Sequence, residues 1–226
     1  MINKPFDRIE KADIEALVAN AVGENRMLDY KEALPGGVDA DKREFLADVS
    51  AFANASGGDL IFGIREQRDA ENKPTGVPEA VCGLPGVNVD AEKLRLENIL
   101  RDGLDPRVSG IQVRAINGFE DGPVMLFRIP KSWNSPHMIK ASSKFYSRNS
   151  SGKYPLDVRE IRSAFAISET LPEKIRRFRD DRLAKIVANE TPIVLASGAK
   201  IVLQLLPIAA FDPTTTLDLA GIKEPS

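Results

Sequence analysis

The stretch of sequence that decides the fold is Phe52-Ala53-Asn54-Ala55-Ser56-Gly57-Gly58-Asp59-Leu60-Ile61-Phe62-Gly63-Ile64. It predicts a helix that ends at the two glycines, followed at once by a strand. The run from Leu60 to Ile64 is apolar without alternation, which is typical of a strand covered on both faces. We interpret one glycine of this pair as the helix C-cap and the second as a point of close backbone packing.

The residues before this stretch predict a helix, a strand and a second helix. Residues 13–22 have apolar side chains at helical spacing, and Gly23 is expected to end that helix. Residues 27–31 alternate with period two, which predicts a strand with Leu28 and Tyr30 on one face and Asp29 and Lys31 on the other. The second helix, through Asn54, is expected to open with a capping box of Asp41 and Glu44. Its buried apolar stripe is expected to consist of Phe45, Val49, Phe52 and Ala53.

The residues after the stretch complete a mixed α/β domain over residues 1–168. They predict, in order, a long loop with one short strand, a helix, a hairpin, a further strand and a short helix opened by a capping box of Asp157 and Glu160. The loop is expected at residues 67–86, the helix at 90–104 and the hairpin at 111–116 with 124–129. The further strand is expected at 144–148 and the short helix at 157–165. Residues 169–226 are expected to form a C-terminal extension with a helix over 172–189, a strand over 201–206 and an unfinished end near 213–216.

Composition limits the classes of function. No apolar run is long enough to cross a bilayer and the start lacks a secretory leader, so a cytoplasmic location is the default expectation. One cysteine and one histidine exclude a conventional zinc site within the chain. A net charge of −2 excludes a protein that coats nucleic acid with its whole surface, so any such contact must be a local patch.

Three blocks of sequence together resemble the Schlafen-like AlbA domain family over roughly residues 9–165. The blocks are residues 23–31 (Gly-Glu-Asn-Arg-Met-Leu-Asp-Tyr-Lys), residues 45–64, and the closing segment from Arg148 through Glu160. The family typically shows an acidic segment ending in lysine, a helix ending Ala-Phe-Ala-Asn, and a Gly-Gly pair before a strand. The order and approximate spacing agree here.

The resemblance implies a compact α/β domain that binds nucleic acid and, in some members, a metal-dependent endoribonuclease built on three carboxylates. Carried over to this chain, Glu24 and Asp29 take the positions of the first two acids and Lys31 that of the nearby lysine. Glu66 is the expected third acid, with Asp69 in reserve. Asp29 departs from the usual glutamate and is one methylene shorter.

Such a trio suits Mg²⁺ or Mn²⁺, because carboxylates bind hard cations that activate water and neutralise charge on a phosphate. Lys31 would steady negative charge on the phosphate oxygens. Glu24 can reach Asp29 only from a turn outside the strand pleat. If the strands over residues 26–31 and 59–66 were parallel with full overlap, Glu24 and Glu66 would lie on the order of 20 Å apart. The trio is therefore expected to need antiparallel or offset strands.

Two further groups of residues are candidates for contact with nucleic-acid phosphates. Arg148, Ser150 and Lys153 lie in a segment that lacks the glycine and the Ser or Thr of a P-loop, so ATP hydrolysis by that mechanism is excluded. Arg176 and Arg177 lie on the charged helix, where a solvated face of salt bridges is the commoner outcome.

Two hypotheses about function follow. The first is a metal-dependent endoribonuclease acting on structured RNA such as tRNA, with Glu24, Asp29 and Glu66 as ligands. The second is a non-catalytic module that binds DNA, RNA or nucleotides and serves regulation or defence. The sequence also leaves open a homo-oligomer in which a second copy completes the binding groove.

Overall fold

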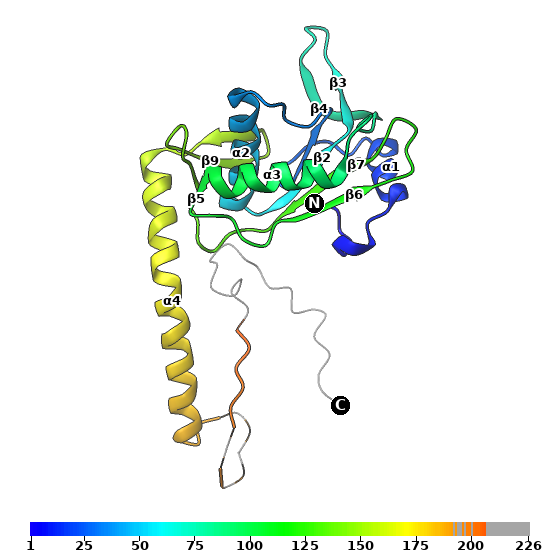
Figure 1. Ribbon diagram of the computed structural model, residues 1–226. Helices are drawn as coiled ribbons and strands as arrows, with labels where there is room; N and C mark the ends of the chain where they lie inside the picture. The colour runs from blue at the N-terminus through cyan, green and yellow to red at the C-terminus, as the bar shows by residue number, and fades with distance from the viewer. Residues whose placement is uncertain (192, 194–195, 197, 200, 207–226) are drawn as a thin grey trace. The chain divides into compact units, whose positions relative to one another are not determined.

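The computed structural model describes residues 1–191, 193, 196, 198–199 and 201–206 of the 226-residue chain (Figure 1). The chain divides into two compact units, residues 1–165 and 166–226. Its helices and strands confirm the mixed α/β class. The helical segments that lie wholly within the first unit are the short 3-10 helix η1 (Phe6–Arg8), α1 (Lys11–Ala19), α2 (Asp39–Asn54) and α3 (Val89–Gly103).

A mixed four-stranded sheet forms the centre of the first unit. Its strands are β1 (Leu28–Lys31), β2 (Gly58–Phe62), β6 (Gln112–Ile116) and β7 (Val124–Ile129). The order across the sheet is β1-β2-β7-β6, with β1 parallel to β2 and the other neighbours antiparallel. The predicted hairpin of β6 and β7 is therefore confirmed.

Both faces of the central sheet are buried, as the unbroken apolar run of β2 predicts. Successive side chains of a strand point to opposite faces. Phe62 accordingly belongs to one core cluster with Phe45 of α2 and Leu96 of α3, while Ile61 belongs to a second cluster with Ile14 of α1. Helices thus cover the sheet on either side (Figure 1).

Two smaller sheets flank the central one. The first has the order β10-β9-β8-β5, and the second is a hairpin of β3 and β4. Their bounds are β3 (Ile64–Arg68), β4 (Pro74–Val81), β5 (Leu104–Asp105), β8 (Met138–Ile139), β9 (Lys144–Asn149) and β10 (Gly152–Pro155). The strand expected within residues 67–86 is present as β4, but the segment is not mainly a loop, because irregular pairing on both sides of Glu66 lets β4 pair with β3 despite Pro74 and Pro78.

Helix ends follow the sequence at some positions and depart from it at others. The capping box of Asp157 and Glu160 is confirmed, since each side chain accepts a hydrogen bond from the other residue's backbone N–H, at 2.8 and 2.9 Å. The box at Asp41 is wrong, because α2 begins at Asp39 with Val38 as its N-cap. The stop at Gly23 is also wrong, because α1 ends at Ala19 and the chain turns through Ala21 at a positive φ of 46°.

Helix α4 (Val158–Val187) is continuous, with Pro172 inside it. The prediction of two helices separated at this proline is therefore wrong. Among the described residues, no helix combines the length and apolar character needed to cross a membrane. Residues 201–206 form no strand, contrary to expectation, and residues 213–216 lie outside the described part of the chain.

Candidate functional site

A tight turn brings Glu24 alongside strand β1. The backbones of Asn25 and Leu28 exchange two hydrogen bonds, at 3.0 and 3.2 Å, which reverse the chain just before the strand. The carboxyl oxygen Oε1 of Glu24 then accepts a hydrogen bond from the backbone N–H of Tyr30 at 2.8 Å. Glu24 therefore lies outside the strand pleat and forms a side-chain hydrogen bond with Asp29, five positions away.

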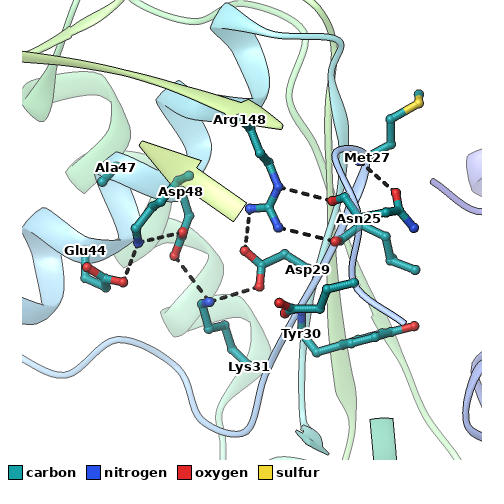
Figure 2. A network of polar contacts seen from close by, with 12 residues as sticks. Asn25, Met27, Asp29, Tyr30, Lys31, Glu44, Ala47, Asp48 and Arg148 are labelled. Carbon is teal, nitrogen blue, oxygen red and sulfur yellow. Dashed lines mark hydrogen bonds and ion pairs between the residues drawn. The ribbon is translucent and has the colours of Figure 1, made fainter. Parts of the chain in front are cut away.

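Asp29 lies on β1 with 3% of its surface exposed, and both of its carboxylate oxygens are paired with cations. Nη1 of Arg148 donates to Oδ2 at 2.6 Å, and Nζ of Lys31 donates to Oδ1 at 2.9 Å. Figure 2 shows the two cations on opposite oxygens of the carboxylate. A buried charge is tolerated when it is paired and hydrogen-bonded in this way.

The pairing continues across α2 to strand β10. Lys31 Nζ lies 3.7 Å from Oδ2 of Asp48, and Asp48 Oδ1 accepts a hydrogen bond from Lys153 Nζ at 2.7 Å. Lys153 also pairs with Glu44 one helical turn away. Charges of alternating sign thus form an ion-pair chain that joins β9, β1, α2 and β10 (Figure 2), composed of Arg148, Asp29, Lys31, Asp48, Lys153 and Glu44.

Arg148 is the most deeply held cation of the ion-pair chain, with 4% of its surface exposed. Besides Asp29, its guanidinium donates to the backbone carbonyls of Asn25 and Leu28 at 3.3 and 3.4 Å. Its planar group lies 4.3 Å from the ring centroid of Phe52, a cation–π contact. Arg148 therefore fastens the turn before β1 to strand β9 and to helix α2.

Glu66 approaches Glu24 through a shared backbone contact with Gly76 of β4. Gly76 N–H donates to Glu66 Oε2 at 2.9 Å, and the Gly76 carbonyl accepts from the Glu24 N–H at 2.6 Å. The expectation that antiparallel or offset strands are required is wrong. Strands β1 and β2 are parallel and fully paired. The turn at residues 25–28 and the interruption of the strand at Gly63, which has a φ of 97°, move Glu24 and Glu66 toward each other.

The environment drives the pKa values of Glu24 and Asp29 apart. Burial, the hydrogen bond with Asp29 and the negative charges of Asp29 and Glu66 raise the pKa of Glu24 to about 9. Burial opposes ionisation of Asp29, but the hydrogen bond from Glu24 and the charges of Lys31 and Arg148 outweigh it and hold the pKa of Asp29 well below its usual range. At neutral pH Glu24 is therefore protonated beside an ionised Asp29.

Replacing Glu24 by glutamine is expected to flatten the pH dependence of stability between pH 4.5 and 9. The folded chain keeps the proton on Glu24 up to a pKa of about 9, whereas the unfolded chain releases it near 4.5. The stability from the protonated carboxyl is complete below pH 4.5 and is lost as the pH rises through 9. Urea unfolding of both proteins at pH 5, 7 and 9 checks this, and parallel profiles would contradict it.

The predicted carboxylates do not fit a preformed metal centre. Both oxygens of Asp29 are taken by cations. Asp69 instead closes the β3–β4 turn, because its Oδ1 accepts from the N–H groups of Glu71 and Lys73. Within the described residues, no group of three or more His, Cys, Asp or Glu is arranged to hold a metal ion.

The residues predicted to contact phosphates lie in different settings. Ser150 is exposed in the β9–β10 turn, whereas Arg148 and Lys153 are engaged in the ion-pair chain. Arg176 and Arg177, on the part of α4 in the second unit, both pair with Glu173. The salt-bridged helix face that the charge pattern favours is thus present around Glu173.

Asp48 is the member of this site that the sequence interpretation missed. It is 2% exposed and lies on the buried side of α2, next to Val49 of the apolar stripe. A single carboxylate within an otherwise apolar stripe is the signal that would have revealed it, since such a residue is rarely buried without a partner.

The mixed sheet is covered by helices on both faces, and ion pairs that are buried at Asp29, Asp48 and Arg148 link β1 to α2, β9 and β10. These features define an α/β domain. The Schlafen AlbA_2 family model matches residues 24–157, which include every member of the ion-pair chain, and the protein belongs to this family. No curated protein matches the sequence.

Two solved structures match part of the chain. The DIP2311 protein from Corynebacterium diphtheriae is 18% identical, with a TM-score of 0.43 over 65% of this chain and 29% of that chain. The N-terminal domain of a RecG-related protein from Nitrosomonas europaea is 20% identical, with a TM-score of 0.39 over 51% of this chain and 71% of that chain. The match thus covers 29% of the length of the Corynebacterium protein.

Proposed function

We propose that this protein binds nucleic acid through a local basic surface of its Schlafen AlbA_2 domain. The observation that carries the proposal is the family match over residues 24–157. Because the whole chain has a net charge of −2, the contact depends on where exposed cations gather, not on the overall charge.

Exposed cations gather where α3 ends and β9 begins. The positive charges of Arg101, Arg107 and Lys140 all act on Asp102, which places the three side chains around one carboxylate. Lys144 follows in the adjacent strand, whose pairing partner is Ile139. We call Arg101, Arg107, Lys140 and Lys144 the basic patch. All four are exposed, and Arg101 is paired with Asp102 at 3.1 Å, so a phosphate would compete with Asp102 for that guanidinium.

In this proposal the ion-pair chain has a structural role. It neutralises the charges of Arg148 and Lys153 inside the protein and links four elements that lie far apart in sequence. Phosphate binding at Arg148 would require its contact with Asp29 to open. At the basic patch only the exposed Arg101–Asp102 pair must open, which costs little, and we therefore assign the contact to this patch.

A second candidate function is cleavage of structured RNA such as tRNA. The observation that favours it is the hydrogen bond between the carboxyls of Glu24 and Asp29, because a protonated glutamate beside an ionised aspartate is suited to donate a proton at neutral pH. A role for Mg²⁺ or Mn²⁺ at these acids would require Asp29 to release a cation.

One pair of assays separates the two functions. Fluorescence anisotropy with labelled tRNA, single-stranded RNA and double-stranded DNA measures binding in EDTA. Gel electrophoresis of the same substrates with Mn²⁺ or EDTA measures cleavage. We expect binding with a Kd on the order of micromolar, weakening as salt rises from about 50 to 200 mM, and no cleavage in either condition.

Matched variants complete the cleavage test. Glu24→Ala removes the protonated carboxyl, and Glu71→Ala removes an exposed glutamate of the β3–β4 turn as a control. Cleavage that needs Mn²⁺, disappears in Glu24→Ala and persists in Glu71→Ala would establish the second candidate. The absence of binding to all three nucleic acids would contradict the proposed function.

A further inference from the structure

A groove of about 690 Å³ lies between helices α2 and α3, apart from the acidic residues already described. Figure 1 shows the two helices beside each other. Each contributes one face, because its lining residues are spaced three or four positions apart. The lining side chains include Lys42, Arg43 and Leu46 of α2 and Arg95, Asn98 and Ile99 of α3.

The floor of the groove is apolar. Leu46 is almost fully buried and Ile99 packs against the same core cluster. Gly103 of α3 lies directly on Leu46, since a Cβ atom at this glycine would fall 2.5 Å from the leucine Cδ1. This volume is within the range of about 300–1,000 Å³ that is typical of small-molecule sites, which combine apolar walls with a few placed polar groups.

The polar groups of the groove differ in how firmly they are held. Arg95 is fixed by Glu92 at 2.6 Å and by the carbonyl of Pro35 at 2.6 Å. Lys42 lies 3.4 Å from Asp39, a loose pair. Within the described part of the chain, the Arg43 side chain has no hydrogen bond or ion pair, and it is exposed. The Arg43 guanidinium can therefore bind a ligand directly, whereas Lys42 and Arg95 are partly neutralised by their partners.

Asn98 adds a second uncommitted polar group. Its amide, which carries both donors and an acceptor, makes no hydrogen bond among the described residues. An amide above an apolar floor can bond the edge of a nucleobase, while a guanidinium beside it binds a phosphate or stacks on the base. These features match the parts of a nucleotide.

The groove also adjoins the basic patch. Asp102, around which the patch cations gather, lines the groove together with Gly103. The backbone N–H of Lys140 donates to the Gly103 carbonyl at 2.9 Å, and Ala141 lines the groove. A nucleic-acid strand whose phosphates follow the patch would thus reach the groove with its next nucleotide.

We propose that the α2–α3 groove holds one unpaired nucleotide, with its base on Leu46 and Ile99 and its phosphate at Arg43. The inference rests on the proposed function and deepens it, because it makes single-stranded nucleic acid the preferred ligand. A free mononucleotide has the same chemistry, so the experiment includes both sources.

The test compares Arg43→Ala with Lys93→Ala, which removes the same charge from a part of α3 outside the groove. Binding of a labelled single-stranded RNA is measured by anisotropy for the wild type and both variants, with AMP and ribose 5-phosphate as competitors. Arg43→Ala is expected to weaken RNA binding about tenfold and to reduce the salt slope by about 1, while Lys93→Ala changes affinity less than twofold.

A third variant, Asn98→Trp, fills the groove without changing the charge. It is expected to weaken binding of intact RNA more than binding of an RNA with several abasic positions, because only the former loses a base contact. Circular dichroism verifies that each variant is folded.

The outcomes separate the two proposals. RNA binding that responds equally to Arg43→Ala and Lys93→Ala, or that is unaffected by Asn98→Trp, overturns the groove assignment and leaves the proposed function standing. Binding of AMP without binding of RNA or DNA supports the groove as a nucleotide site and contradicts the proposed function. Absence of binding to AMP and to every nucleic acid overturns both.

Discussion

Substitution of Asp29 by alanine is expected to lower the free energy of unfolding by about 3–5 kcal/mol, the usual cost of breaking a buried ion pair. Arg148 would keep its buried position but lose its carboxylate partner, and Lys31 would lose its closest anion. Arg148 would then be buried without a carboxylate partner, while Lys31 would keep only Asp48, at 3.7 Å. Urea unfolding at pH 7, followed by circular dichroism, measures the loss.

Two further variants make this prediction specific. Glu79→Ala removes a carboxylate whose 3.0 Å pair with Arg65 is exposed, so its expected cost is below about 1 kcal/mol. The double variant Asp29→Leu with Arg148→Met removes both buried charges and is expected to recover much of the lost stability. A loss for Asp29→Ala no larger than that for Glu79→Ala would contradict a structural role for the ion-pair chain.

Substitution of Gly57 by alanine is expected to cost about 2–5 kcal/mol, combining left-handed backbone strain with overpacking. Gly57 has a φ of 71°, and a Cβ atom there would lie 2.6 Å from the backbone nitrogen of Lys131 and 2.7 Å from the carbonyl oxygen of Ile129. Backbone atoms cannot rotate away as a side chain can, so part of the segment after β7 must shift.

Gly37→Ala is the matched control for this substitution. No atom lies within 4 Å of a Cβ at Gly37, and the residue has no positive φ. Its stability is expected to stay unchanged or to rise by about 0.4–1 kcal/mol, because alanine restricts the unfolded chain. Equal melting temperatures for the two variants would show that Gly57 is not required for the close contact.

Local patterns were sufficient to predict much of the central sheet. Helix α2 ends at Asn54 with Ala55 as its C-cap, so the prediction that one of the two glycines is the C-cap is wrong, although Gly57 follows at a positive φ and its N–H bonds the Phe52 carbonyl at 2.8 Å. Gly58 permits the close packing that the sequence suggested, since a Cβ there would fall 2.4 Å from the ring of Phe52. Both roles depend on neighbours that are close in sequence.

The β3–β4 hairpin and the continuous helix α4 were not predictable from the same rules. The prolines in residues 67–86 indicate a loop, but the irregular pairing around Glu66 accommodates them. Pro172 indicates a break, yet α4 passes through it. In both places the surrounding structure outweighs the local preference of proline.

The candidate site shows the same division between local and distant information. The proximity of Glu24 and Asp29 follows from a short segment, because one turn suffices to bring them together. The pairing of Asp29 with Arg148 joins residues 119 positions apart, and that of Asp48 with Lys153 joins residues 105 positions apart. Such contacts depend on how β9 and β10 lie against α2, which no local periodicity specifies.

The most direct test of the account is the salt dependence of tRNA and single-stranded RNA binding by the wild-type chain, measured by anisotropy in EDTA. We predict saturable binding that weakens linearly in a plot of log affinity against log salt, as contact with several phosphates requires. No binding at about 50 mM salt, or an affinity independent of salt, would contradict the claim that a local basic surface of this domain binds nucleic acid.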